Sequence, residues 1–336
     1  MNIALIGATG AVGREMLREL EKSPFIQGDT ELSLFASERS QGQFLRFRER
    51  SLKVRNVTEL SGDRFDFVLM SAGSHVSCEY APILAAHGAI VIDNSSAFRM
   101  DEDVPLVVPE VNGSVLAGLT SGIIANPNCS TIQLVVSLCP LQRLAGLETV
   151  ILSTYQSVSG SGQKGIDELS RQLHSDVRTP DVYPQPIAFN VISHIGALTE
   201  GGPCEEELKI IRESRKILNL PDLSVLVTTA RVPVYHCHCE SVVVQLQQAV
   251  DLAEVDRAFG SMPGLICHAP DLSVEELPSP YHCTERPEVF VSRLRLLWGE
   301  HRSRWLQYWN VADNLKKGAA TNAVQIMEQV LRQRQL

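Results

Sequence analysis

The sequence lacks any apolar run near the ~18 residues that a membrane-spanning helix requires. It has no internal repeat and no low-complexity segment, and no basic stretch precedes its first apolar residues, so we expect neither a membrane anchor nor a signal peptide. Excess positive charge is also missing. The formal net charge of −9 disfavours a general nucleic-acid binder, because phosphate contacts need a basic face. A small anionic ligand needs only a few well-placed Arg and Lys side chains.

Eight cysteines are present among 336 residues, and a chain of this length buries a large core without disulfides or metals. Without an export signal, we expect these cysteines to be reduced thiols, mostly small buried hydrophobes. Hydrophobic residues make up 44% and charged residues 21% of the chain, which is typical of a globular protein. The length suggests about two domains. We therefore expect a cytoplasmic globular protein.

The first 128 residues alternate short apolar runs with helix-like stretches. We expect strands over residues 3–6, 32–36, 67–70 and 89–92, and helices over residues 11–20 and 81–86. Strands that alternate with helices predict βαβ units and a parallel sheet, which binds ligands at the carboxyl ends of its strands.

From about residue 129 the pattern changes. A helix over 130–138 precedes β-rich runs over 148–153, 224–228, 241–245 and 289–297, with a helical pattern over 205–218. Such runs suit a mostly antiparallel sheet with one covered face. Helical spacing over 323–331 predicts a last helix that packs on a core. The predicted class is α/β: a Rossmann-type parallel-sheet nucleotide domain (1–128 plus 312–336) and an α+β domain (129–311).

A glycine-rich turn directly follows the first expected strand and opens a helix. Glycines let the backbone approach a pyrophosphate, and the helix N-terminus offers N–H groups and the positive end of its dipole. A merely structural turn is the alternative, but the strand before it and the helix after it favour a dinucleotide site. The predicted binding residues are Gly7, Thr9, Gly10, Ala11, Val12 and Gly13.

The turn after the second strand bears on which dinucleotide binds. An acidic residue there usually holds the ribose hydroxyls of NAD, whereas Arg with hydroxyls suits the 2′-phosphate of NADP. Glu38 and Arg39 are both present, and Ser37, Arg39 and Ser40 together favour NADP. A solvated turn without a ligand is the alternative.

Cys129 lies in the segment Asn126-Pro127-Asn128-Cys129, just before a periodic apolar run. Pro127 disfavours helix at the residue before it, so Cys129 is expected at a helix N-terminus. Such positions lower a cysteine pKa from ~8.5 into the range ~3.5–7.5, which favours a nucleophilic thiolate. An inert buried cysteine is the alternative, and it fits most of the other seven better.

The segment 230–240 allows two interpretations. As a metal site it offers His236, Cys237, His238 and Cys239. On an extended strand the two histidines face one way and the two cysteines the other, so the four cannot converge on one tetrahedral ion. Zinc is therefore the minor interpretation, even with Cys267, His268, His282 or Cys283 as outside ligands, and we expect no metal. As a catalytic segment, it offers a guanidinium and an imidazole, with a structural histidine as the alternative.

Taken together, these motifs resemble the aspartate-semialdehyde dehydrogenase family. The resemblance runs through nearly the whole chain, in the right order, and is far more specific than one glycine-rich loop. The matching segments are residues 7–13, 36–40, 91–99, 108–112, 126–131, 155–160, 187–190, 206–209, 231–238, 312–314 and 317–320.

The resemblance implies a reaction. Cys129 would attack the aldehyde of L-aspartate 4-semialdehyde, and hydride transfer to NADP would leave an acyl-thioester. Inorganic phosphate would convert the thioester to L-4-aspartyl phosphate, and biosynthesis of lysine, diaminopimelate, methionine and threonine would use the reverse direction. His238 resembles the family's acid/base, because its spacing from Arg231 matches and that of His236 does not.

The resemblance also implies further roles. Gln156 would orient the substrate beside the thiol, next to Asn128. Arg231 would hold the α-carboxylate bidentately, which Lys cannot copy, and Glu206 would pair with the α-ammonium. Phosphate would bind Arg99 and Lys209 in a water-poor site, where charge interactions are strong. The remaining implied residues are Ser159, Gly160 and Asn314 at the cofactor. The second domain would be catalytic and would form a homodimer or a dimer of dimers.

The sequence departs from the family in two loops. Ser74 and His75 stand where a paired glycine is common near the nicotinamide, and Ser193 stands where proline is common. Neither change removes a reacting group. The rival interpretations are an N-acetyl-γ-glutamyl-phosphate reductase-like enzyme, whose substrate has no free ammonium for Glu206, a catalytically silent dinucleotide-binding paralogue, and a zinc-binding interaction protein.

Overall fold

The computed structural model describes residues 1–60, 64–175, 178–268, 273–297 and 301–334. The chain divides into two compact units, Met1–Asn128 with Ala319–Leu336, and Cys129–Gly318. We expected the chain to re-enter the first unit at residue 312, but it does so at Ala319. Ala312 ends strand β13 (Ser303–Ala312) and pairs with His238 and Val289, so it belongs to the sheet of the second unit.

The described part of the first unit contains a seven-stranded sheet of order β3-β4-β2-β1-β5-β6-β7. Every neighbouring pair is parallel except β3 with β4, which confirms the expected Rossmann-type sheet and adds an antiparallel pair at one edge. The strands are β1 (Asn2–Ile6), β2 (Glu31–Ala36), β3 (Phe44–Phe47), β4 (Arg50–Asn56), β5 (Phe67–Met70), β6 (Ile90–Asp93) and β7 (Gly122–Ala125).

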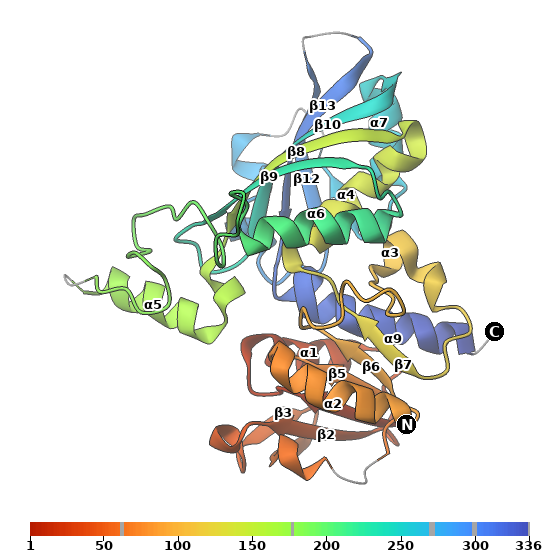
Figure 1. Cartoon of the computed structure of the whole chain (residues 1–336), viewed down its shortest axis with the longest axis vertical. Helices are drawn as coiled ribbons and strands as arrows, with labels where there is room; N and C mark the ends of the chain where they lie inside the picture. Colours follow the sequence, from red (N-terminus) through yellow and green to blue (C-terminus); the bar gives the residue numbers. More distant parts are fainter. Residues whose placement is uncertain (61–63, 176–177, 269–272, 298–300, 335–336) are drawn as a thin grey trace. The chain divides into compact units, whose positions relative to one another are not determined.

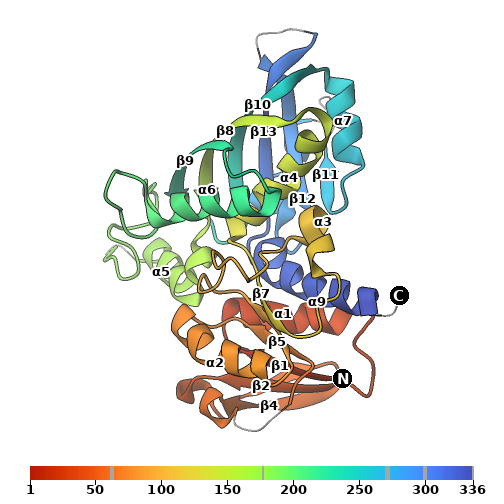
Figure 2. The same cartoon turned by 45° about the vertical axis from the view of Figure 1, so that its right-hand side comes forward.

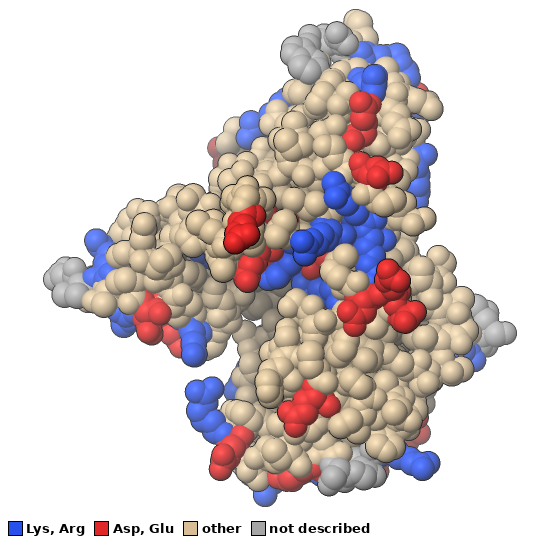
Figure 3. All heavy atoms as spheres, in the orientation of Figure 1, with Lys and Arg blue, Asp and Glu red and all other residues tan. Residues whose placement is uncertain are grey.

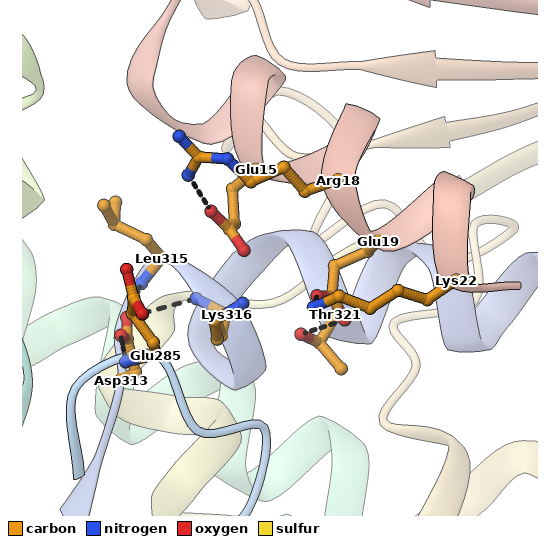
Figure 4. A network of polar contacts seen from close by, with 9 residues as sticks. All are labelled: Glu15, Arg18, Glu19, Lys22, Glu285, Asp313, Leu315, Lys316 and Thr321. Carbon is orange, nitrogen blue, oxygen red and sulfur yellow. Dashed lines mark hydrogen bonds and ion pairs between the residues drawn. The ribbon is translucent and has the colours of Figure 1, made fainter. Parts of the chain in front are cut away.

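Helices cover both faces of this sheet (Figure 1). Helices α1 (Ala11–Lys22) and α9 (Thr321–Arg334) share one apolar core, and α2 (Ser74–Ala86) packs on the other. Thr321 Oγ1 donates to Glu19 Oε2 at 3.0 Å and joins α9 to α1 (Figure 4). The shorter elements are η1 (Glu38–Ser40), η2 (Val57–Glu59), α3 (Pro109–Asn112) and η3 (Gly113–Leu116).

The second unit is built on a six-stranded sheet of order β11-β12-β13-β10-β8-β9 among its described residues. Three pairs are antiparallel and two, β8 with β9 and β11 with β12, are parallel, so the expected mostly antiparallel sheet is confirmed. The other strands are β8 (Leu147–Gln156), β9 (Ser224–Arg231), β10 (His238–Val250), β11 (Leu265–Cys267) and β12 (Val289–Leu296).

Three helices cover one face of this sheet: α4 (Cys129–Ala145), α6 (Glu205–Leu218) and α7 (Leu252–Gly260) (Figure 2). Helix α4 lies between the other two and is almost entirely buried. The remaining elements are η4 (Val158–Ser161), α5 (Gln163–Leu173), η5 (Val274–Glu276), α8 (Pro280–Cys283) and the π-helical η7 (Lys316–Ala320). No helix in the described part of the chain is both long and apolar enough to cross a membrane.

Residues 232–237 form a loop, although the segment 230–240 was considered as one extended strand. Strand β9 ends at Arg231 and β10 begins at His238, on opposite sides of β8. Pro233 lies in this loop, and Cys237 has a φ of 68°. The expectation that His236 and His238 share one strand face is therefore wrong, because the chain crosses from one strand to another between Arg231 and His238.

A buried carboxyl group lies between this sheet and α4. Glu240 is fully buried, and its Oε2 accepts a hydrogen bond from Asn310 Nδ2 at 2.8 Å. Burial raises the pKa of Glu240 to about 8, although hydrogen bonds from Asn310 and Gln133 favour the charged form. Among the described residues, Glu240 Oε1 and Gln133 Oε1 are buried acceptors without a hydrogen-bond partner. A protonated Glu240 carboxyl group adds an O–H donor to this environment, which a carboxylate cannot do. We therefore expect Glu240 to be neutral at pH 7.

We predict that Glu240→Gln makes stability less dependent on pH. An acid whose pKa rises on folding keeps its proton while the unfolded chain releases it, so stability falls between pH 4.5 and about 8. Below pH 4.5 both states are protonated and this loss is absent. Each pH unit in this window removes at most about 1.4 kcal/mol from the wild type, whereas glutamine does not titrate.

Thermal melting at about pH 5 and about pH 8 measures this difference. The melting temperature of Glu240→Gln should rise relative to wild type as the pH increases. The exposed Glu102→Gln is the matched control and should show no such trend. A constant difference between Glu240→Gln and wild type at both pH values would contradict a protonated Glu240.

Candidate functional site

Strand register brings three of the expected site residues together. Gln156 ends β8, and its direct partners are Arg231 at the end of β9 and His238 at the start of β10. Side chains of directly opposed residues share one face of a sheet. All three are buried, at 1%, 6% and 0% exposed respectively, on the side covered by α4 and α6. Residues far apart in the sequence therefore form one row across three strands.

Helix α6 adds two more expected residues. Gln156 Nε2 donates to Glu206 Oε1 at 3.0 Å, and Lys209 Nζ lies 3.4 Å from Glu206 Oε2. Glu206 is buried because it lies on the inner face of α6, whereas Lys209 one turn later is partly exposed. Figure 3 shows Lys and Arg side chains gathered over α6, which carries Lys209, Arg212, Arg215 and Lys216.

The Arg231 guanidinium is held by the backbone. Its NH1 donates to the Ser157 carbonyl oxygen at 2.7 Å. A Cβ on Gly160 would lie 2.7 Å from this NH1, so a glycine is needed for the observed position of the guanidinium. Arg231 also lines a pocket of about 280 Å³ whose polar side chains include Ser161, Tyr183 and His194. The pocket suits an anionic group, because a buried guanidinium points to it.

His238 is held in a fixed orientation. Its Nδ1 accepts a hydrogen bond from the Ser157 backbone N–H at 3.1 Å, and the Ser157 hydroxyl lies 3.3 Å away. The Nε2 atom is buried and has no hydrogen-bond partner among the described residues. Burial, followed by the positive charge of Arg231, lowers the pKa of His238 to about 3, although Glu206 opposes the shift. His236 lies in the preceding loop and is partly exposed.

Cys129 is the first residue of α4, as its sequence context predicted. A Cβ on Gly318 would lie 3.0 Å from the Cβ of Cys129, so the chain passes close behind the thiol only because residue 318 is glycine. The Asp313 carboxylate holds this segment: it accepts hydrogen bonds from the backbone N–H groups of Leu315 and Lys316, and of Glu285 (Figure 4). One turn after Cys129, Gln133 Nε2 donates to the His238 carbonyl at 3.4 Å.

The expected cofactor residues of this unit contact one another. Ser159 Oγ lies 2.9 Å from Asn314 Nδ2, and Ser157 Oγ donates to Asn314 Oδ1 at 3.1 Å. All three side chains are buried. Gly160 completes the group, because its missing side chain leaves space beside Nε2 of His238, where a Cβ would lie 3.3 Å away.

In the first unit the glycine-rich loop has the tight geometry that a phosphate cradle requires. Gly7 has a φ of 82°, and a Cβ there would lie 2.2 Å from the Ser71 carbonyl oxygen. A Cβ on Gly13 would lie 2.1 Å from the Gly7 carbonyl oxygen. Gly10 directly precedes α1, so Ala11, Val12 and Gly13 form its first turn, whose N–H groups are available to an anion. These residues fit a dinucleotide pyrophosphate.

The two loops expected to hold the dinucleotide meet. Thr9 Oγ1 donates to Ser40 Oγ at 3.1 Å, which links the glycine-rich loop to the turn after β2. Ser37, Glu38 and Arg39 are exposed in this turn. Neither Glu38 nor Arg39 has an ion pair within the described residues, so both remain available to a ribose or its 2′-phosphate.

Arg99 and Asn128, the other expected residues, belong to the first unit. Arg99 is buried, and its NH2 donates to the Asn94 carbonyl at 2.9 Å in the turn after β6. Asn128 is also buried and directly precedes Cys129. In the loops that depart from the family, Ser74 Oγ lies 3.2 Å from Ser96 Oγ, and Ser193 follows Ile192, whose backbone pairs with Arg231.

The cysteines near His238 pack among apolar side chains. Among the described residues, no group of three or more His, Cys, Asp or Glu side chains is arranged to hold a metal ion. Cys237, Cys239 and Cys283 pack in one apolar cluster with Phe290 and Val311. Burial raises the pKa of Cys239 to about 12 and that of Cys283 to about 11, so both are protonated thiols at neutral pH.

Sequence reasoning missed three residues that position this site. Ser157 holds both His238 and Arg231 through its backbone. Gly318 passes behind the Cys129 thiol, and the Asp313 carboxylate fixes the turn that leads to Gly318. All three lie inside the matching segments 155–160, 312–314 and 317–320, but nothing in these segments shows that a backbone N–H, a carboxylate that holds a turn or a missing Cβ positions the site. The site as a whole combines a helix-start thiol, a neutral imidazole and a buried guanidinium, which suits nucleophilic attack on a small anionic carbonyl compound.

Two family models match most of the chain. The one described as "Semialdehyde dehydrogenase, NAD binding domain" matches residues 2–119, and the one described as "Semialdehyde dehydrogenase, dimerisation domain" matches residues 138–317. The first match contains the glycine-rich loop, and the second contains the row of Gln156, Arg231 and His238.

Individual proteins match over their full length. The aspartate-semialdehyde dehydrogenase of Aquifex aeolicus is 42% identical over 98% of each chain, and that of Bacillus subtilis is 41% identical over 98% of this chain and 96% of its own. Among solved structures, aspartate semialdehyde dehydrogenase II from Vibrio cholerae, complexed with ASA, is 41% identical over 98% of each chain with a TM-score of 0.92.

Proposed function

The chain belongs to the aspartate-semialdehyde dehydrogenase family, and from that membership we propose that it catalyses the NADP-dependent, reversible reductive dephosphorylation of L-4-aspartyl phosphate to L-aspartate 4-semialdehyde. The observation that carries the proposal is the row of Arg231, Gln156 and His238 beside the helix that begins at Cys129. The reaction serves the biosynthesis of lysine and diaminopimelate, methionine and threonine.

Cys129 is the proposed nucleophile. The N-terminus of α4 favours its thiolate, which adds to the aldehyde carbon and forms a thiohemiacetal. When bound, the nicotinamide of NADP supplies the acceptor for the hydride that leaves this carbon. The resulting thioester on Cys129 is attacked by phosphate, which releases the acyl phosphate and restores the thiolate. Biosynthesis runs through the same intermediate in reverse.

The amino-acid end of the substrate has a proposed partner for each of its charges. Arg231 binds the α-carboxylate, because its guanidinium is buried, held by the Ser157 carbonyl and open to a pocket. Glu206 binds the α-ammonium, since its carboxylate is buried on the inner face of α6. Gln156 contacts Glu206 directly and orients the substrate carbonyl, with Asn128 next to the thiol.

Phosphate is proposed to bind Lys209 and Arg99. Lys209 and Glu206 form an ion pair at 3.4 Å, and phosphate at Lys209 with the substrate ammonium at Glu206 would exchange this pair for two new ones. The basic residues of α6 favour the approach of anions in a chain whose net charge is −9 (Figure 3).

The proposed NADP site uses the close approaches of the glycine-rich loop for the pyrophosphate and Ser37, Arg39 and Ser40 for the 2′-phosphate. The Thr9–Ser40 hydrogen bond supports this division, because it places both loops at one location. Ser159, Gly160 and Asn314 are proposed to contact the nicotinamide end. Buried hydrogen bonds between Asn314 and the hydroxyls of Ser159 and Ser157 give Ser159 and Asn314 fixed positions.

The nearest rival is an N-acetyl-γ-glutamyl-phosphate reductase-like activity. Glu206 favours the free amino acid, because an acylated nitrogen leaves this buried carboxylate without a cationic partner from the substrate. A silent paralogue is disfavoured, since Cys129, Gln156, Arg231 and His238 are all present and the last three lie in one row.

A homodimer, or a dimer of dimers, is proposed to form through the face of the second sheet opposite α4, α6 and α7. On this face Ile151, Tyr155 and Leu226 are 40%, 38% and 52% exposed. The ring centroids of Tyr155 and Trp309 lie 5.4 Å apart. Burial of such a face against a second copy removes apolar surface from water.

The proposed reaction is tested by NADP reduction with L-aspartate 4-semialdehyde, with and without phosphate, beside N-acetylglutamate 5-semialdehyde. We expect phosphate-dependent reduction with the first substrate only. Cys129→Ala should abolish turnover yet bind NADP like the wild type, since no other residue replaces the nucleophile. Intact-mass analysis should show an acyl adduct on the wild type alone. Turnover in Cys129→Ala, or an adduct on another cysteine, would refute the proposed nucleophile.

The cofactor preference is tested with Arg39→Ala. A charge-assisted hydrogen bond to the 2′-phosphate contributes about 1.5–3 kcal/mol, so the wild type should prefer NADP over NAD by at least about tenfold in kcat/KM. Arg39→Ala should reduce this ratio and leave kcat/KM with NAD nearly unchanged. Glu38→Gln is the matched control from the same turn. Equal kcat/KM with NADP and NAD in the wild type would contradict the proposed contact between Arg39 and the 2′-phosphate.

A further inference from the structure

A chain of three asparagine side chains in the first unit leads to the arginine that is proposed to bind phosphate. From it we propose that Asn94 and Asn126 are positioning residues for the phosphate step: Asn126 fixes Asn94, and Asn94 fixes the guanidinium of Arg99. The inference rests on the proposed function and specifies how that reaction keeps its phosphate-binding group in place. Neither amide touches the substrate, since both act through Arg99.

The three asparagines lie where separate elements of the first unit end or begin. Asn94 directly follows β6, Asn126 directly follows β7, and Asn322 is the second residue of α9. Strands β6 and β7 are parallel neighbours, so their carboxyl ends bring Asn94 and Asn126 together. The Asn126 backbone N–H donates to the Asp93 carbonyl at 2.8 Å. Strand register therefore fixes where the fully buried Asn126 side chain starts.

Two backbone carbonyl groups fix the direction of every hydrogen bond in this chain. Asn322 Nδ2 donates to the Val107 carbonyl at 2.9 Å and to Asn126 Oδ1 at 2.7 Å. Asn126 Nδ2 donates to the Ala319 carbonyl at 3.1 Å and to Asn94 Oδ1. A backbone carbonyl only accepts, so Asn322 and Asn126 must each present a nitrogen to it. The remaining contact follows, because Asn126 then accepts through oxygen and Asn94 accepts from Asn126.

Asn94 connects this chain to Arg99. Its side-chain oxygen accepts from Asn126, and its backbone carbonyl accepts from Arg99 NH2 at 2.9 Å. Both N–H groups of Asn126 Nδ2 are used, and a buried N–H that loses its acceptor costs free energy, so Asn94 is held in one position. The buried Asp93 carboxylate holds the same turn, because it accepts from the Ser95 N–H at 3.1 Å and from the Ser95 hydroxyl at 2.7 Å.

The end point of the chain selects one half of the reaction. In that half a phosphate oxygen bonds to the acyl carbon, the C–S bond breaks, and its electron pair returns to the Cys129 sulfur, while hydrogen phosphate releases its proton to solvent. Arg99 holds phosphate bidentately only while its N–H groups keep a fixed direction. Gln156 and Arg231, which bind the aldehyde for hydride transfer, belong to the second unit. A change at Asn94 should therefore weaken phosphate binding and leave hydride transfer unchanged.

Asn94→Ala in the full-length protein tests the proposal by separating these two halves. Without phosphate, L-aspartate 4-semialdehyde should give a burst of about one NADPH per subunit, with a rate constant within about twofold of wild type. With phosphate, the KM for phosphate should rise about three- to tenfold, the effect of one neutral hydrogen bond. Asn112→Ala is the matched control, because the Asn112 side chain also makes two hydrogen bonds in this unit and neither involves Arg99. It should leave the KM for phosphate unchanged.

A merely structural role for Asn94 gives a different result. Asn94→Ala would then lower the melting temperature as Asn112→Ala does, and the KM for phosphate would stay within about twofold of wild type. That outcome would overturn the inference. A burst that slows as much as phosphate-dependent turnover would also overturn it, because the phosphate half would then not be the part affected.

A second measurement needs no turnover. Inorganic phosphate that binds the folded protein raises its melting temperature, with sodium chloride of equal ionic strength as the reference. The rise should be smaller in Asn94→Ala than in wild type and Asn112→Ala. Asn126→Ala should reduce it no further when combined with Asn94→Ala, since both changes break one hydrogen bond. Equal rises in Asn94→Ala and wild type, or additive losses in the double variant, would contradict the proposal.

The partly exposed Asn94 keeps the test decisive if the fully buried Asn126→Ala does not fold. The comparison of Asn94→Ala with Asn112→Ala then stands by itself. If the wild type fails to reduce NADP with L-aspartate 4-semialdehyde and phosphate, the proposed function fails instead. The phosphate-dependent rise in melting temperature still decides whether Asn94 positions Arg99.

Discussion

The hydrogen bond from the Ser157 N–H to His238 Nδ1 depends on the register of the second sheet. Because Gln156 pairs with both Arg231 and His238, the next residue after β8 reaches both neighbouring strands with its backbone. The N–H of Ser157 fixes the imidazole and its carbonyl oxygen fixes the guanidinium. The backbone of Ser157 thus orients the His238 imidazole and the Arg231 guanidinium relative to each other. A slip of one residue between β8 and β10 would separate them.

The thiol is tied to the same sheet by buried polar contacts. The side chain of Gln133, one turn after Cys129, donates to the His238 backbone carbonyl, and the Gln133 backbone carbonyl accepts from Asn310 Nδ2. Asn310 in turn donates to Glu240. In a buried environment such contacts are costly to break, so α4 has one preferred position on β10 and β13. A charged Glu240 would be costly on β10, the strand that begins at His238, because burial penalises the charged form of its carboxyl group.

Local patterns predicted the parts of the molecule that depend on local signals. Alternating apolar runs predicted the parallel sheet, and a proline before an apolar run predicted that a helix starts at Cys129. Strand β13 was missed, because its apolar and polar residues do not alternate as their burial does: Asn310 is buried, whereas Trp309 is partly exposed. The role of Ser157 was invisible for a different reason. Every residue has an N–H and a carbonyl, and only long-range strand register shows which of them meet His238 and Arg231.

The central claim is that the row formed by Arg231, Gln156 and His238 binds the substrate that Cys129 attacks. A crystal structure of the Cys129→Ala variant with L-aspartate 4-semialdehyde tests this claim directly. We predict that the α-carboxylate lies against the Arg231 guanidinium and the α-ammonium against the Glu206 carboxylate. Substrate bound in the reverse orientation, or away from this row, would contradict the claim.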